Sequence, residues 1–111
     1  MDRSEFFKDY RNFVSFRPDR YGKATLFESE QVLVGLNILE IGQSMEKHAH
    51  EVQHRFYLVL EGKGHFRIGD LEGDYSEGTV AWVPAGKAHQ IQNLGNQPLV
   101  MLVGIAPAQA D

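Results

Sequence analysis

Four histidines in this sequence stand at spacings that suit a metal site. His48 and His50 are two residues apart in a His-Ala-His sequence, and His54 and His89 follow them. Because successive side chains of a strand point to opposite faces, the first two imidazoles share one face if this segment is extended. Such a pair chelates a divalent ion but leaves it open to exchange, so a third ligand from a neighbouring strand is needed. His89 is the candidate for that position.

The fifth histidine, His65, has a different setting. It alternates with Phe66 and Ile68, which we expect to face the core, so His65 and Arg67 should lie on the solvent or subunit-contact face. An isolated histidine is usually such a surface or hydrogen-bonded residue. We therefore leave His65 out of the candidate site.

The composition limits the chemistry and the partners. The 111 residues include no cysteine, which excludes disulfides, thiolate ligands and a cysteine nucleophile. A net charge of -4 without clustered Lys or Arg gives no footprint for nucleic acid. The N-terminus lacks the apolar core of a signal peptide, and no segment approaches the roughly 20 apolar residues of a membrane span. We expect a cytoplasmic protein with no membrane partner.

Short apolar runs separated by glycines predict an all-β domain with the strand spacing of a sandwich or closed barrel. We divide the single domain into an N-terminal arm or short helix with the first strand (1–30), a barrel (31–106) and a frayed tail (107–111). The expected strands are 25–28, 32–41, 46–50, 56–60, 65–68, 79–83, 89–92 and 99–105. Within the arm, Ser4 is the expected cap of a short helix, whose aromatic face comprises Phe6, Phe7, Tyr10 and Phe13. The dipeptides Gly69-Asp70 and Gly73-Asp74 are expected in a hairpin turn between two strands.

Two motifs resemble the signatures of the cupin superfamily. The segment from Gly78 through Pro84, Gly86 and His89 to Asn93 fits the second cupin signature at every spacing. Pro and Gly there predict a tight turn before His89 enters the barrel. This resemblance implies a double-stranded β-helix, or jelly-roll barrel, of the small single-domain, type-2 kind.

The first cupin signature is also matched, by Gly42, His48, His50 and Gly62, but its glutamate is missing. Counting ungapped from both flanks places Arg55 at the glutamate position, with Tyr57 next on the inner face. A guanidinium cannot ligate a cation, so the metal would rest on three histidines, with Arg55 as a contact for a substrate anion. This arrangement resembles the three-histidine thiol dioxygenases among the cupins.

A shorter spacing instead puts His54 at the glutamate position, with a bulge before Gly62. Alternation favours this register, because Phe56, Leu58 and Leu60 then face the core while Arg55 and Tyr57 point outward. The four-histidine arrangement resembles that of some small manganese- or iron-binding cupins. We prefer it, and both registers stay open at this stage.

Ligation by imidazoles alone leaves the ion its full positive charge, so the site should attract a small, anionic organic ligand. The expected cofactor is one divalent transition metal, with Fe, Mn, Zn, Ni and Cu all suited to such a site. We expect a metal-dependent oxygenase or other oxidoreductase, although no residue can be called catalytic. The alternatives are a metal-dependent isomerase, lyase or epimerase, and a non-catalytic small-molecule-binding barrel. Uncovered strand edges and spare N-terminal aromatic residues lead us to expect a homodimer.

Overall fold

The computed structural model describes residues 2–108, and these residues form two short 3-10 helices and nine strands. The all-β prediction is confirmed. The helices are η1 (Arg3–Glu5) and η2 (Tyr10–Phe13). The strands are β1 (Gly22–Glu28), β2 (Leu33–Leu39), β3 (Ser44–His48), β4 (His54–Glu61), β5 (Lys63–Ile68), β6 (Leu71–Ser76), β7 (Val80–Val83), β8 (His89–Gln92) and β9 (Leu99–Ala106).

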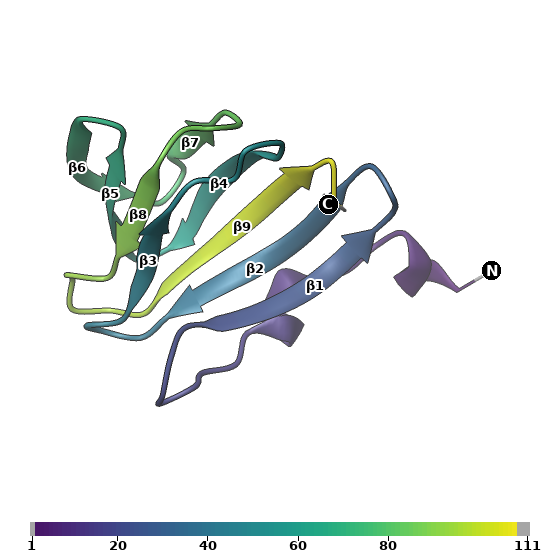
Figure 1. The fold of residues 1–111 in the computed structure, drawn as a ribbon. Coiled ribbons are helices and arrows are strands. Elements are labelled where there is room, and N and C mark those ends of the chain that lie inside the picture. The colour runs from purple at the N-terminus through teal and green to yellow at the C-terminus, as the bar shows by residue number, and fades with distance from the viewer. Residues whose placement is uncertain (1, 109–111) are drawn as a thin grey trace.

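The strands form two antiparallel sheets that face each other (Figure 1). One sheet has the order β1-β2-β9-β4-β7 and the other the order β3-β8-β5-β6. Strands β1 and β3 are therefore edge strands on one side of the sandwich, and β7 and β6 are edge strands on the other. Each of these two sides has a hollow lined by side chains of its edge strands.

The main core lies between the sheets and contains Tyr57, Val59, Phe66, Ile91 and Met101, each at most 3% exposed. Alternate side chains of these strands point inward from both sheets, as a sandwich requires. The buried polar residues within 2–108 are Asn37, Asn93 and His89, and the last of these lies at the candidate site.

A second apolar cluster covers the outer face of the larger sheet. Leu36, Ile38 and Val100 are buried there, and Tyr10 and Phe13 of the N-terminal arm pack over them. The Tyr10 hydroxyl donates to the Glu61 carboxylate at 2.7 Å, which fixes the arm on β4. The predicted docking of an aromatic arm is thus correct for these two residues, whereas Phe6 and Phe7 are 57% and 69% exposed.

The predicted N-terminal helix is wrong in its form. Instead of one helix capped by Ser4, the chain makes two separate 3-10 turns, capped by the side chains of Asp2 and Asp9. Each aspartate accepts a backbone N–H two residues ahead, a local bond that competes with a continuous helix.

One strand, β6, is missing from the sequence prediction. Gly73 and Asp74, expected in a turn, lie within this edge strand, and Gly73 pairs with Phe66. The strand is polar and mostly exposed, so it shows no hydrophobic alternation. Of the expected tail, residues 109–111 lie outside the described part of the chain. Among residues 2–108, no helix has the length and hydrophobicity to span a bilayer.

Candidate metal centre

Three of the predicted ligands come together in the structure. His48 at the end of β3 is paired directly with His89 at the start of β8. The ring centres are 4.5 Å apart for His48 and His50, 4.9 Å for His48 and His89, and 6.0 Å for His50 and His89. The sequence predicted a shared face for His48 and His50 and named His89 as a third ligand from a neighbouring strand, and the three imidazoles lie next to one another in the structure.

The turn before β8 places His50 in this group. Gly86 has φ +84°, a left-handed conformation suited to glycine, and Lys87 N donates to Pro84 O at 3.1 Å across the turn. Gly86 N in turn donates to the carbonyl of His50 at 2.8 Å. The second signature motif therefore holds the histidine that follows β3 as well as its own His89.

Two buried ring nitrogens in the cluster have no hydrogen-bond partner among the described residues: Nε2 of His50 and Nδ1 of His89. The other ring nitrogen of His89 meets the Tyr57 hydroxyl at 3.2 Å, and Nδ1 of His48 contacts the Glu46 carbonyl at 2.7 Å. A buried polar atom without a partner costs about 1–3 kcal/mol. The cluster thus contains two buried imidazole nitrogens without a partner among residues 2–108, which a ligand could satisfy.

The spacing of the rings is close to that required by a shared ion. With a metal–nitrogen bond of about 2.1 Å, two imidazole centres on one ion lie roughly 4.5–5.5 Å apart. Two of the three separations fall in this range and the third is slightly longer. As the side chains lie, no group of three or more His, Asp or Glu residues within 2–108 is already in a metal-binding arrangement. The three histidines therefore fit a metal in type and position, and small ring rotations would still be required.

The surroundings favour neutral imidazoles at two positions. Burial, together with the nearby charge of Arg55, lowers the pKa of His50 to about 4. Burial, with His48 beside it, likewise lowers the pKa of His89 to about 4. Because a metal ligand must be deprotonated, both rings are ready to bind a cation at neutral pH without releasing a proton.

The preferred four-histidine register is not the one that the structure has. His54 is exposed on the outer side of β4, stacked on Trp82 with ring centres 5.7 Å apart, and its Nδ1 accepts from Ala85 N at 3.0 Å. Arg55 points inward instead and lines the cavity with His48 and His50. The structure thus has Arg55 at the position where the cupin signature has glutamate.

The alternation argument failed because both faces of β4 are apolar. Tyr57 and Val59 are buried between the sheets, whereas Phe56 is 36% exposed and Leu60 packs under the N-terminal arm. Since the arm covers the outer face near Leu60, apolar side chains there do not mark the core side. Counting from the two flanking motifs gave the correct register.

Arg55 forms part of a cavity of about 300 Å³ beside the histidines, between β1, β2, β9 and β3. Its Nη2 donates to Gln53 at 3.1 Å, but its buried Nε has no partner among residues 2–108. Tyr57 lies fully buried next to it, and burial raises the pKa of this tyrosine although Arg55 opposes the shift. The other lining residues are Tyr21, Lys23, Ala24, Thr25, Leu33, Gly35, Leu36, Asn37, Met45, Val103 and Ile105.

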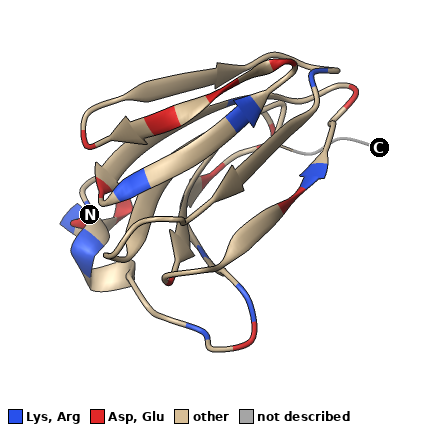
Figure 2. Cartoon of the chain, turned by 90° about the vertical axis from the view of Figure 1, so that its left-hand side faces the viewer, with Lys and Arg blue, Asp and Glu red and all other residues tan. Residues whose placement is uncertain are grey.

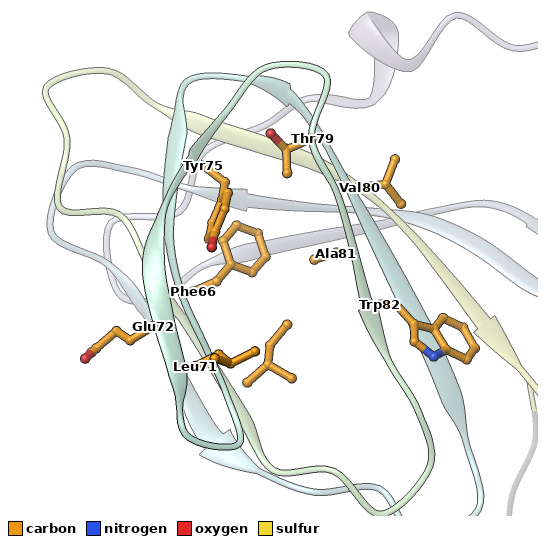
Figure 3. Close-up of a pocket in the computed structure, with 9 residues that line it drawn as sticks. Phe66, Leu71, Glu72, Tyr75, Thr79, Val80, Ala81 and Trp82 are labelled. Atoms are coloured by element: carbon orange, nitrogen blue, oxygen red, sulfur yellow. The ribbon is translucent and has the colours of Figure 1, made fainter.

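A second hollow of about 280 Å³ lies on the other side of the sandwich, between β6 and β7 (Figure 3). It is lined mainly by aromatic and aliphatic side chains, including Phe66, Tyr75 and Trp82. Trp82 is the residue on which His54 stacks, so this predicted ligand lies beside the aromatic hollow rather than the histidine cluster. Tyr57 and Phe66, with ring centres 6.4 Å apart, lie between the two regions.

Sequence reasoning missed two polar residues of the cavity, Lys23 and Asn37, and its preferred register misplaced a third residue, Tyr57. Tyr57 was placed outward by the preferred register, although the ungapped count had put it on the inner face. Lys23 and Asn37 lie on neighbouring strands and are paired across β1 and β2. They belong to neither histidine motif, so only the three-dimensional pairing of β1 and β2 places them at the cavity.

Two antiparallel sheets with a histidine cluster between β3 and β8 define a double-stranded β-helix protein with a candidate metal centre. The family model for the cupin domain matches residues 35–105. The chain belongs to the cupin family.

Similar proteins agree with this assignment. The crystal structure of TT1209 from Thermus thermophilus superposes with a TM-score of 0.87 and 34% identity, over 91% of this chain and 96% of that one. The protein MJ1618 of Methanocaldococcus jannaschii is 29% identical over 65 residues, 59% of this chain and 52% of that protein. The oxalate decarboxylase OxdC of Bacillus subtilis is 29% identical over 79 residues, 67% of this chain but 20% of the enzyme. The chain thus spans about half the length of the first relative and a fifth of the second.

Proposed function

We propose that this protein binds one divalent transition metal through His48, His50 and His89 and acts on a small organic anion held beside it. The observation that carries the proposal is the cluster itself, with ring centres 4.5–6.0 Å apart and two buried ring nitrogens without partners in the described part of the chain. Fe, Mn, Zn, Ni and Cu all suit three imidazole ligands. The proposed site has three histidine ligands rather than the four of the preferred prediction, because His54 points away from the cluster.

The metal and Arg55 would have different roles at this site. When bound, a divalent ion supplies Lewis-acid or redox chemistry to a substrate at its open positions. Arg55 replaces an anionic ligand by a fixed cation, so it neither binds the metal nor offsets its charge. It lines the cavity beside the histidines, where its guanidinium suits a carboxylate or phosphate group.

Binding tests the metal proposal directly. We expect metal-free protein to take up one Zn²⁺ or Mn²⁺ per chain in calorimetry, with His48→Ala and His89→Ala each weakening affinity at least about tenfold. His54→Ala is the matched control, because it removes an exposed imidazole outside the cluster, and it should leave affinity unchanged. Equal loss in the control and the cluster variants would defeat the three-histidine site.

The reaction class divides into two candidates. Oxygenase chemistry is our first choice, because three ligands leave open positions for both substrate and dioxygen. Carbon–carbon bond cleavage as a lyase is the second, supported by the similarity to oxalate decarboxylase. Dioxygen consumption by Fe- or Mn-loaded protein with small thiols and organic acids supports the first, whereas turnover under strict anaerobiosis supports the second. If neither occurs while ligand still binds, the protein is a non-catalytic binding barrel.

A further inference from the structure

A second group of basic residues lies at the mouth of the histidine cavity. A hollow of about 270 Å³ at this place is lined by Arg17, Arg20, Tyr21 and Lys23. Tyr21 and Lys23 also line the cavity that contains His48, His50 and Arg55. The two hollows therefore adjoin at the start of β1.

The charged side chains that line the two hollows are all basic. Within residues 2–108, no Asp or Glu lines either hollow, although the chain as a whole carries a net charge of -4. The loop before β1, with its basic residues in blue, forms the lowest part of the view in Figure 2. A cavity lined by one sign of charge concentrates ligands of the opposite sign.

Two of these mouth residues remain available to a ligand. Arg17 is paired with Asp19 at 3.2 Å, which neutralises much of its charge. Among the residues that the structure describes, no carboxylate lies within 4.0 Å of the charged nitrogens of Arg20 or Lys23. Lys23 extends over the Tyr21 ring, with its Nζ 5.5 Å from the ring centre.

The inner and outer cations belong to different elements. Arg55 lies on β4 inside the cavity, with Nε buried and unpartnered among the described residues, whereas Lys23 is an exposed residue of β1. Lys23 lines both hollows, whereas Arg20 lines only the outer one and Arg55 only the inner one.

We propose that Arg20 and Lys23 form a second anion subsite, so that the ligand carries two acidic groups. One acidic group contacts Arg55 beside the histidines, and the other stays at the mouth. The ligand class is therefore a small dicarboxylate, or a carboxylate that also bears a phosphate. The inference rests on the proposed function for the position of the site, but ion pairing at Arg20 and Lys23 does not require the metal.

The test uses metal-free protein at low ionic strength, where exposed charges act most strongly. Calorimetric titration compares succinate and glutarate with butyrate and valerate, which have the same chain lengths and one carboxylate. Phosphoglycolate is the test ligand that carries both a carboxylate and a phosphate. We expect the dianions to bind about tenfold tighter than the monoanions, an advantage of about 1.4 kcal/mol.

The variant Arg20→Gln/Lys23→Gln should remove this preference for dianions and leave the affinity for butyrate within about twofold. Lys63→Gln is the control for a lost positive charge, because Lys63 lines a different hollow, and it should retain the preference. Equal binding of succinate and butyrate, a preference that survives the double variant, or an equal loss in Lys63→Gln would overturn the proposal. The metal titration is a separate test. If the protein binds no metal but still prefers dianions, the metal site is refuted and the second anion subsite is not.

Discussion

At the scale of single residues, the site is distinguished by Tyr57. It is fully buried, and its hydroxyl meets Nε2 of His89 at 3.2 Å. That nitrogen cannot bind both the hydroxyl and an ion. A metal could bind His89 through Nδ1, which has no partner among residues 2–108, or through Nε2. Binding through Nε2 would release the Tyr57 hydroxyl, which would then lie beside Arg55.

Tyr57→Phe tests this competition. We expect the metal-free variant to lose about 1 kcal/mol of unfolding free energy, because a buried hydrogen bond to His89 is removed. The metal-bound variant should lose less unfolding free energy, so metal affinity should rise by up to about fivefold. Denaturant unfolding with and without Zn²⁺ measures both effects. Tyr75→Phe, a change at a 45% exposed ring, should alter neither, and a fall in affinity for Tyr57→Phe would contradict the competition.

The histidines also predict how the metal-free protein responds to pH. Burial holds the pKa of His50 and His89 at about 4, below the unfolded value of about 6.5. Between these values the unfolded chain binds more protons than the folded one, so unfolding free energy should fall as pH falls from 6.5 to 4. Asp74 and Glu72 instead raise the pKa of His65, whose contribution is present below pH 6.5 and lost as pH rises through its folded value. Titration of the ring signals by NMR at about pH 5.5 should show His50 and His89 neutral and His65 charged.

At the scale of elements, the two signature motifs predicted more than the strand pattern did. The spacing of Pro84, Gly86 and His89 predicted a turn, and the structure has that turn with His89 at the start of β8. Alternation along β4 failed for His54 and Arg55, because an N-terminal arm distant in sequence covers the outer face. Alternation reports which residues are buried, but it cannot say whether the other sheet or the arm buries them.

Gly62, a glycine of the first signature motif, lies in the turn between β4 and β5, and substitution tests its role. Gly62 has φ +82°, and a Cβ there would clash with the carbonyl oxygen of Pro98, whereas Gly42 has φ +88° with nothing within 4 Å of such an atom. Gly42→Ala should therefore cost only about 1 kcal/mol for the left-handed backbone. Gly62→Ala carries the same strain and a clash with backbone, so we expect a loss of about 2–4 kcal/mol. Urea unfolding measures the difference, and equal losses would show that the turn moves away from Pro98 without cost.

At the scale of the whole molecule, composition and glycine spacing were sufficient to predict an all-β domain, and the histidine motifs were sufficient to predict its kind. The position of the basic residues was not predictable, since Lys23 lines the cavity of His50 only through the pairing of β1 with β2 and the facing of the two sheets. The chain buries its core without help from the centre: the cluster of Leu39, Ile91 and Leu99 is fully buried and apolar. The metal is thus expected to serve chemistry rather than folding.

The assembly of whole chains is the remaining prediction. The arm leaves Phe6 and Phe7 exposed, and the edge strand β7 exposes Val80 and Trp82, at 62% and 58%. Exposed apolar residues on an unpaired edge favour association, so we expect a homodimer of the 12.6 kDa chain in light scattering. Phe6→Ser/Phe7→Ser should yield a monomer if the arm forms the contact, as the sequence led us to expect. If β7 instead pairs with β7 of a second chain, Val80→Lys should yield the monomer. A wild-type mass of one chain at micromolar concentration would contradict both contacts.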